Sequence, residues 1–275
     1  MKGVQPMTAA IHHDTHQNLR PHLPQLRVEL AATPADVYAS QRLRYEIFAK
    51  EQGAQLESAS EGIDRDHYDD YCHHLLVRRT DNNEVVGSTR ILTTPNARKA
   101  GSFYSENEFD LRGLFPQLKG NAIEIGRTCI HPDFRNGAGI GMLWLGLAQF
   151  MEMHRVDFMF GCASISMNDG GAQASAIMQE ARANNIAPAE LRVKPLMHLL
   201  PAQPAAKVNM PPLLKAYLKL GAWVAGEPCL DPDFNVADIF ILLDVNNLNT
   251  RYHRHFVQGS LQRRPVSDVG LLQAA

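Results

Sequence analysis

A glycine-rich segment follows one apolar run and precedes another, and it is the first feature of this sequence with a recognisable chemistry. The segment consists of Arg135, Asn136, Gly137, Ala138, Gly139, Ile140 and Gly141. Free backbone N–H groups at a helix N-terminus form a cradle for a phosphate group, and glycine lets such a ligand approach the backbone closely. A tight turn between a strand and a helix accounts for the same glycines equally well.

A second group of candidate residues is spread over the first half of the chain. Its members are Arg44 with Phe48, Asp66 with Asp69, Arg90, and Glu124 with Arg127. Some of them have an ordinary explanation when taken singly. Arg44 fits a solvated helix residue, and Asp66 and Asp69 fit a polar loop. Only the arrangement of the whole group points to a binding site.

The elements that must position these residues alternate between strands and helices. Thr33 as N-cap and Pro34 at the first helical position predict a helix that runs to about Lys50. We expect strands at 27–30, 74–77, 84–92, 122–130, 157–163 and 237–245, and helices at 140–156, 170–185 and 213–220. The second and third strands form a hairpin, a polar loop covers 51–70, and a proline-rich crossover covers 188–212. This order predicts an α/β fold around a mixed sheet flanked by helices.

Composition limits the classes of protein to consider. The chain has 275 residues, of which 45% are hydrophobic and 20% are charged, and this is typical of a globular protein. The formal net charge is -2, which argues against a nucleic-acid partner. We expect a flexible leader at residues 1–25, a single domain at 26–256 and a mobile tail at 257–275.

The four cysteines lie far apart, with no C-x-x-C pair, which favours free thiols in a reducing compartment and predicts no metal site. Cys162 has no base near it in the sequence, so we expect a buried thiol. The N-terminal residues have no apolar core of the kind a secretory signal needs, and no apolar run approaches the ~20 residues that span a bilayer. We expect a cytoplasmic protein, with peripheral contact at the inner membrane surface left open.

The segment 123–150, IEIGRTCIHPDFRNGAGIGMLWLGLAQF, resembles the cofactor-binding segment of the GNAT acyltransferase superfamily. The resemblance implies a GNAT-like fold with a splayed central sheet. In that superfamily the splayed strand, here with Cys129 and Ile130, pairs with pantetheine amides, and the following loop, here 135–139, takes the phosphates. Ala138 and Ile140 stand where the usual pattern has small residues after Arg135, so the glycines are offset by one. The phosphopantetheine arm of an acyl carrier protein needs less of that cradle, and acyl-CoA is the alternative donor.

Longer strings in order along roughly 40–256 resemble the ornithine N-acyltransferase family, a hemolysin-like branch related to the acyl-homoserine-lactone synthases. They include LRYEIFAKEQGA, VVGSTRIL, GSFYSENEFDL, DPDFNVADIFILL and RYHRHF. The resemblance implies transfer of a 3-hydroxyacyl group from acyl carrier protein to the α-amine of ornithine, which gives lyso-ornithine lipid, with no permanently bound cofactor. Glycine or another amino acid as acceptor, and synthesis of an acyl-amide or lactone signal, are the alternatives.

For this reaction an amine must lose a proton and attack a thioester. Glu124, on the strand that faces the thioester, is the candidate base, and pairing with an arginine is its alternative role. Burial among apolar neighbours raises the pKa of a carboxylate, as a base for an ammonium group requires. Arg127 lies three residues on, so a regular strand points it to the opposite face. A β-bulge marked by Gly126 would bring both side chains to one site.

The other charged residues suit recognition of the acceptor. Asp66 and Asp69 suit a cationic acceptor such as ornithine, and Phe48 accompanies them in the resemblance. Arg90 or Arg44 could pair with the acceptor carboxylate, because a planar guanidinium matches a carboxylate. Arg44 tying down the acidic loop through salt bridges is an equal alternative.

Overall fold

A computed structural model describes residues 25–248 of the chain. The strands are β1 (Leu26–Leu30), β2 (His73–Arg79), β3 (Val85–Thr93), β4 (Phe109–Asp110), β5 (Asn121–Ile130), β6 (Val156–Ser166), β7 (Lys194–Pro195), β8 (Trp223–Val224), β9 (Cys229–Asp231) and β10 (Val236–Asp244). The helices are α1 (Pro34–Tyr45), α2 (Thr94–Ala100), α3 (Ala138–Met153), α4 (Ala172–Asn184) and α5 (Pro212–Leu220). Residues 1–24 of the expected leader, 249–256 of the expected domain and the expected tail at 257–275 lie outside the described residues.

The N-terminus of α1 forms as local sequence signals predict. The Thr33 side chain accepts a hydrogen bond from the backbone N–H of Asp36, and the Asp36 carboxylate accepts one from the N–H of Thr33. Pro34 occupies the first turn, where its missing N–H costs nothing. The helix continues beyond Tyr45 as a π-helical turn that carries Phe48, so the expected end near Lys50 is confirmed.

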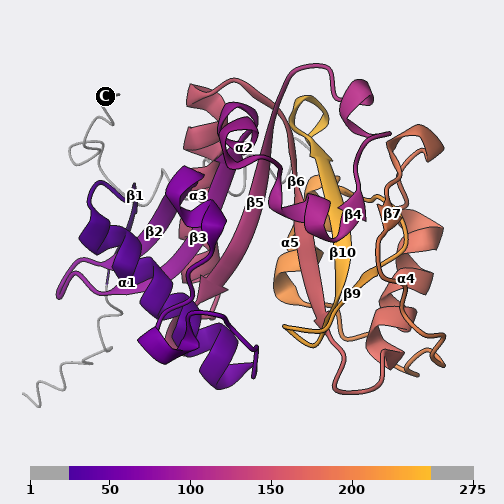
Figure 1. The fold of residues 1–275 in the computed structure, drawn as a ribbon, viewed down its shortest axis with the longest axis horizontal. Helices are drawn as coiled ribbons and strands as arrows, with labels where there is room; N and C mark the ends of the chain where they lie inside the picture. Colours follow the sequence, from indigo (N-terminus) through magenta and orange to yellow (C-terminus); the bar gives the residue numbers. More distant parts are fainter. Residues whose placement is uncertain (1–24, 249–275) are drawn as a thin grey trace, which may run out of the picture.

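Most of the strands form one mixed sheet in the order β1-β2-β3-β5-β6-β10-β8, with β9 also paired to β10 (Figure 1). Neighbours in it are antiparallel except β5 and β6, which run parallel. The hairpin of β2 and β3 is confirmed. Strands β4 and β7 form a separate small sheet.

The central sheet is splayed between β5 and β6. The two strands pair only from Asn121 to Glu124, and beyond that point they diverge (Figure 1). Gly161 lies at the point of divergence, where a Cβ atom would stand 2.2 Å from the carbonyl oxygen of Ile125. The predicted mixed, splayed sheet with flanking helices is therefore confirmed.

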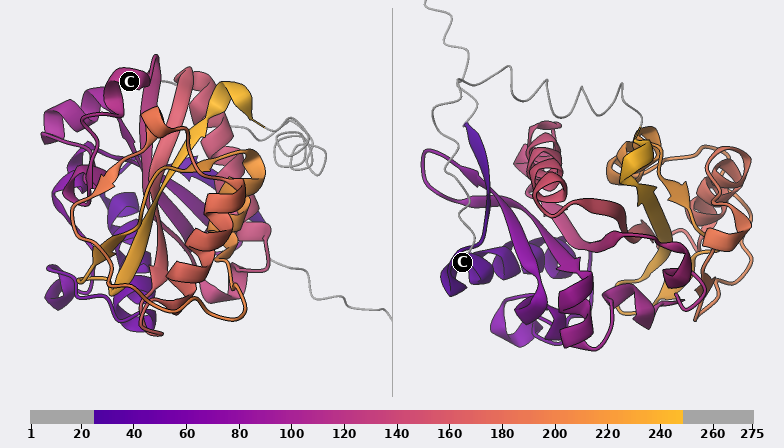
Figure 2. Two further views of the ribbon diagram at one scale, coloured as in Figure 1. Left: turned by 90° about the vertical axis from the view of Figure 1, so that its right-hand side faces the viewer. Right: turned by 90° about the horizontal axis from the view of Figure 1, so that it is seen from above.

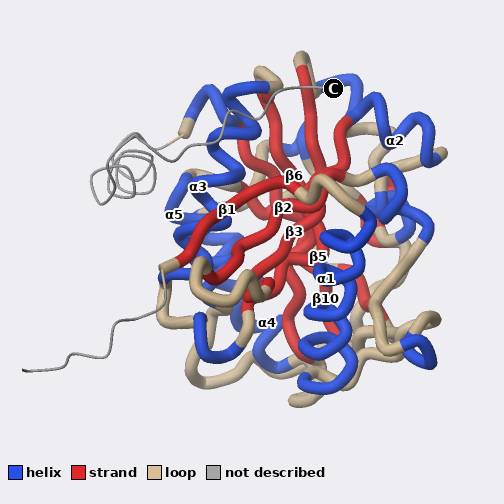
Figure 3. Tube along the Cα trace, turned by 90° about the vertical axis from the view of Figure 1, so that its left-hand side faces the viewer, coloured by secondary structure: helices blue, strands red, loops and turns tan. Residues whose placement is uncertain are grey.

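Helices cover both faces of the sheet. α3 and α5 lie on one face, and α1 and α2 lie on the other (Figures 2 and 3). Neighbouring strand residues point to opposite faces, so Leu76 of β2 packs in one cluster with Leu43 of α1, whereas Leu75 packs in another with Leu143 of α3. No helix within residues 25–248 combines the length and the apolar character needed to cross a bilayer.

Some elements differ from the sequence-based expectations. The helix expected to reach residue 156 ends at Met153, because Arg155 adopts a left-handed conformation with φ of 49° and β6 begins at Val156. The loop expected at 51–70 contains two short 3-10 turns. Helix α2 and the short strands β4, β7, β8 and β9 were not predicted.

Candidate active site

A cavity of about 220 Å³ lies in the divergence of β5 and β6. Residues 124–128 of β5 and 159–164 of β6 form two of its walls, and Phe48, Tyr217 and Phe234 close it from other elements. From Ile125 onward β5 has no pairing with β6, so strand backbone lines the cavity. An unpaired strand edge offers N–H and C=O groups to an extended ligand.

Glu124 lines this cavity and is the last residue of β5 that pairs with β6. Glu124 is buried, with only 3% of the residue exposed. It accepts hydrogen bonds from the backbone N–H groups of Tyr104 and Ser105, each at 2.7 Å, and from the Ser105 hydroxyl. Burial raises the pKa of Glu124, although the hydrogen bonds from Ser105 and Tyr104 oppose that rise.

A β-bulge places Arg127 in the same cavity as Glu124. In the pairing of β3 with β5, Arg127 and Thr128 together stand opposite the single residue Thr89. Arg127 itself has a positive φ of 50°, which few side chains adopt. The bulge is therefore present, but it is centred on Arg127 rather than on Gly126, because Arg127 takes the left-handed conformation and Gly126 does not.

Aromatic rings and carboxylates hold the Arg127 guanidinium. Its central carbon lies 4.8 Å from the ring centre of Tyr104 and 4.5 Å from that of Phe234. Its Nε lies 3.2 Å from Asp64 and one terminal nitrogen lies 3.4 Å from Asp66. These contacts fix a positive charge at the wall of the cavity.

Four of the five predicted substrate-binding residues form a buried ion-pair network instead of lining the cavity. Arg44, which is fully buried, bonds Asp69 through two nitrogens at 2.5 and 3.1 Å and Asp64 at 2.7 Å. Arg90 bonds Asp66 at 2.5 Å. These contacts favour the alternative in which Arg44 anchors the acidic loop.

Phe48 is the fifth predicted substrate-binding residue, and it does line the cavity. Its ring meets that of Phe234 edge to face, with the ring centres 5.9 Å apart. The two rings thus form an apolar wall next to Arg127.

The predicted donor-binding residues lie outside the lining of this cavity. Cys129 is buried in the cluster on the α1 face, and Ile130 ends β5. Both outer nitrogens of Arg135 bond the Glu51 carboxylate at 2.5 and 2.7 Å, while its Nε bonds the carbonyl of Ile130. Arg135 therefore already has an anionic partner from the end of the first helical segment.

The glycine-rich loop shapes the start of α3. Gly137 is the N-cap with φ of 96°, and Asn136 accepts a hydrogen bond from the N–H of Ala138. A Cβ at Gly139 would lie 2.9 Å from the side chain of Ile130, so glycine is needed there for close packing. The strand-to-helix turn thus has a structural explanation, and phosphate binding by this loop stays a prediction.

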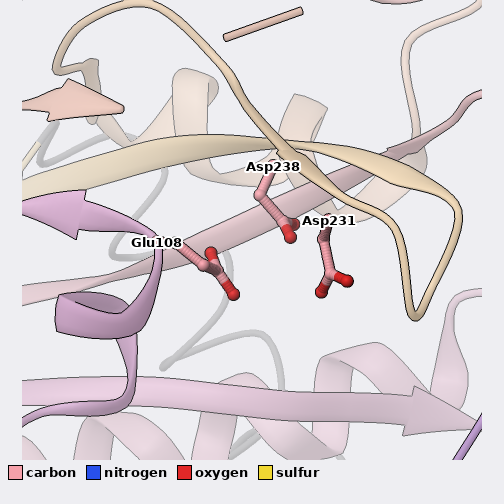
Figure 4. Close-up of side chains that lie close together, drawn as sticks. All are labelled: Glu108, Asp231 and Asp238. Carbon is pink, nitrogen blue, oxygen red and sulfur yellow. The ribbon is translucent and has the colours of Figure 1, made fainter. Parts of the chain in front are cut away.

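Three acidic residues of the cavity were not singled out from the sequence. Glu108, Asp231 and Asp238 come from three segments, and their carboxylates converge (Figure 4). Burial and the neighbouring Asp238 raise the pKa of Glu108 well above its ordinary value. Burial likewise raises the pKa of Asp238 to about 6, against a hydrogen bond from Ser164. The sequence signal for these residues is weak. It consists of the strings NEFDL and DPDFNVAD, in which acidic residues stand beside apolar ones.

Cys162 also faces the cavity, with its sulfur 3.5 Å from the Ser105 hydroxyl. Burial raises the pKa of Cys162 well above its ordinary value, and the charge of Glu108 adds to that rise. The residue is therefore a neutral thiol, which is a poor nucleophile.

These groups together suit proton removal beside an extended ligand. The cavity offers a buried carboxylate with a raised pKa, a fixed guanidinium and two strand edges with free backbone groups. An amine that attacks a carbonyl group needs a proton acceptor and donors for the developing oxyanion. No further group is needed if the carbonyl carbon is already activated.

Comparisons with known proteins identify relatives of this chain. The family model "Acetyltransferase (GNAT) domain" matches residues 43–145. The chain is 32% identical to the L-ornithine N(alpha)-acyltransferase of Brucella abortus (strain 2308), over 93% of this chain and 97% of that protein. It is also 32% identical to the protein of the same name from Rhodobacter capsulatus, over 86% of this chain and 96% of that protein. Among solved structures, the acyl-homoserine-lactone synthase LasI is 13% identical, with a TM-score of 0.47 over 86% of this chain and 96% of that one.

Proposed function

The chain belongs to the family of the L-ornithine N(alpha)-acyltransferases and carries a GNAT domain, as its motifs predict, and from this premise we propose that it acylates the α-amine of L-ornithine. The donor in this proposal is a 3-hydroxyacyl thioester of acyl carrier protein, and the product is lyso-ornithine lipid. The observation that carries the proposal is the cavity between β5 and β6 with the Glu124 carboxylate on its wall.

The thioester arm lies along the divergence of the two strands. A phosphopantetheine arm carries two amide groups, which can pair with a strand edge as a neighbouring strand would. The inner edge of β5 beyond Glu124 is free for such pairing. The side chain of Arg135 already bonds Glu51, which supports a donor that relies little on a pyrophosphate cradle. Acyl carrier protein fits that requirement better than coenzyme A.

Glu124 acts as the general base in the proposed reaction. It takes a proton from the α-ammonium of the acceptor, directly or through one water molecule. The amine nitrogen then forms a bond to the thioester carbon, and the C–S bond breaks. The nitrogen loses a second proton as the C–S bond breaks, and the leaving thiolate takes up that proton, so the products are an amide and a free carrier thiol. Glu124 gives the first proton to water. Free backbone N–H groups of the strand edges stabilise the oxyanion of the tetrahedral intermediate.

The product is amphiphilic, so it must pass into a bilayer after release. The segment that directly follows β7 exposes three large apolar side chains. They are Leu196, Met197 and Leu200, which are 59%, 47% and 85% exposed. Exposed apolar side chains in one segment suit contact with a lipid surface. We infer a cytoplasmic enzyme that works at the inner membrane surface.

The proposal is tested by release of free thiol from purified full-length protein. The donors are a 3-hydroxyacyl carrier protein and the matching acyl-CoA, and the acceptors are ornithine, glycine and no amino acid. We expect ornithine-dependent release with the carrier protein, and mass spectrometry of the product should show the acyl group on the α-nitrogen. Failure of every amino acid in a full panel to stimulate release with either donor would overturn the proposal.

A further inference from the structure

We propose that Glu108, Asp231 and Asp238 form a pocket for the side-chain ammonium of a diamino acid acceptor. This inference rests on the proposed function, and it deepens that function by naming the residues that select the acceptor. One oxygen of each carboxylate lies within 4.8 Å of the other two (Figure 4). Glu108 follows a 3-10 turn, Asp231 ends β9, and Asp238 lies on β10.

Glu108 supplies the second observation that points to a ligand. The residue is only 7% exposed, and although the Cys162 thiol acts on the carboxylate as a donor and lowers its pKa, the Oε2 atom has no hydrogen-bond partner among the described residues. A buried carboxylate oxygen without a donor is destabilising, so native structures nearly always provide one. Here the carboxylate faces Asp231 and Asp238 in the wall of the cavity, where an incoming donor can reach it (Figure 4).

An ammonium group matches this arrangement better than a hard metal ion does. An ammonium is a compact charge with three donors, and three carboxylates surround the site. Asp238 already accepts from the Ser164 hydroxyl at 2.6 Å, and one oxygen of Asp231 accepts from the N–H groups of Asp233 and Phe234. At most four of the six carboxylate oxygens are therefore left, whereas calcium takes six to eight oxygen ligands and magnesium demands octahedral geometry.

The pocket is also correctly placed for the reaction. It shares its cavity with Glu124, whose charge acts on the pKa of Glu108. The cavity also holds Arg127, whose charge acts on the pKa of Asp238. An acceptor with its side-chain ammonium among the acidic residues therefore has its α-amino end near the candidate base and its carboxylate near a guanidinium.

The titration behaviour of Asp238 gives an independent readout. The groups that face it are Ser164 on β6, Asp231 on β9, Arg127 on β5 and the nearby Glu108. With a pKa raised to about 6, Asp238 is partly protonated in the empty site at pH 6. Because an ammonium favours the carboxylate, its binding must release protons at that pH. Calorimetry of ornithine binding in two buffers of different ionisation enthalpy measures that release.

The decisive experiment compares ornithine with norvaline, which has the same carbon chain but no side-chain amine. We expect the full-length protein to prefer ornithine by about 100-fold or more in kcat/KM, because a polar site rejects an analogue that lacks its partner. Glu108→Gln and Asp238→Asn should each lower kcat/KM for ornithine by about 10- to 100-fold and leave that for norvaline within threefold. Asp233→Asn, which removes an exposed carboxylate two residues from Asp231, should change neither value.

Equal use of ornithine and norvaline by the unaltered protein would overturn the inference. An equal loss with both acceptors in the two pocket variants would also overturn it. Melting curves show whether each variant is folded. If Glu108→Gln does not fold, the near-isosteric Asp238→Asn provides the test instead. If no acceptor releases thiol, the proposed function fails, but calorimetric titration with ornithine still decides the inference. Ornithine binding to the unaltered protein that is lost in Glu108→Gln supports the inference. No ornithine binding to the unaltered protein refutes it, as does Mg²⁺ or Ca²⁺ binding that ornithine does not displace.

Discussion

Replacing Arg44 with methionine tests whether this residue stabilises the fold or recognises the acceptor. Arg44 is fully buried, and three of its nitrogens bond the buried carboxylates of Asp64 and Asp69. Methionine keeps much of the length and apolar volume of the side chain but removes the charge. Two carboxylates would then lie in the interior without their main cation.

The expected loss of stability follows from that burial. Breaking a buried ion pair on one side costs about 3 to 5 kcal/mol of unfolding free energy, because the remaining charge is uncompensated. For a domain of this size each kcal/mol corresponds to about 2 to 4 °C, so the melting temperature should fall by about 6 to 20 °C. Arg65→Met is the matched control, since Arg65 pairs with Glu61 at the surface with both side chains half exposed. It should cost no more than about 0.5 kcal/mol.

The stabilisation that Arg44 provides should also depend on pH, in a direction that follows from the pKa of Asp69. Burial by itself raises the pKa of Asp69, but the hydrogen bond and charge of Arg44 hold it well below the ordinary value. This contribution to stability is therefore complete above about pH 4 and is lost only as the pH falls further. In Arg44→Met the buried Asp69 protonates more readily, so the difference in melting temperature should narrow as the pH falls from 7 to 5.

Urea denaturation and calorimetry measure the stability, and acceptor-dependent thiol release gives KM and kcat. The control Arg65→Met should melt within about 2 °C of the unaltered protein. If Arg44→Met does so too, the buried network does not stabilise the fold as argued. A large rise in the acceptor KM with unchanged melting would instead favour the alternative in which Arg44 binds the acceptor carboxylate.

Three further variants test the catalytic cavity. Glu124→Gln should lower kcat for thiol release by about 100-fold or more with little change in the acceptor KM, and turnover within threefold would remove Glu124 as the base. Gly161→Ala places a Cβ against the carbonyl oxygen of Ile125, so activity should fall at least tenfold, whereas Gly141→Ala in α3, where nothing lies within 4 Å, should keep it. Cys162→Ala should retain turnover, since burial keeps that thiol neutral, and complete inactivity with an intact melting curve would indicate a covalent acyl intermediate instead.

Local signals predicted the longer elements well. Thr33 and Asp36 form the capping box that starts α1, and this interaction is readable over four residues. The end of α3 is different, because it depends on the left-handed Arg155, a residue type with no preference for that conformation. Strands β8 and β9 are two and three residues long and form through pairing with β10 and through bridges to Ile186 and His198, so their few residues show no periodicity.

The site was predicted less completely, for a physical reason. Arg44 and Asp69 carry the charges that an acceptor site needs, but in the fold they bond each other. Sequence alone does not distinguish a charge that awaits a substrate from one that is already paired. The convergence of Glu108 with Asp238 is invisible in the sequence, because 130 residues separate them and only the fold brings them together.

The short parallel pairing of β5 with β6 has a mechanical consequence. Each strand is bound along its other side to a full-length neighbour, β3 or β10, whereas the two are joined to each other only from Asn121 to Glu124. Helix α3 spans the gap, because it packs against β1, β2 and β3 on one side and against β6 on the other. Glu124 lies on the short paired strip itself. The strip that ends the gap therefore also sets the position of the candidate base.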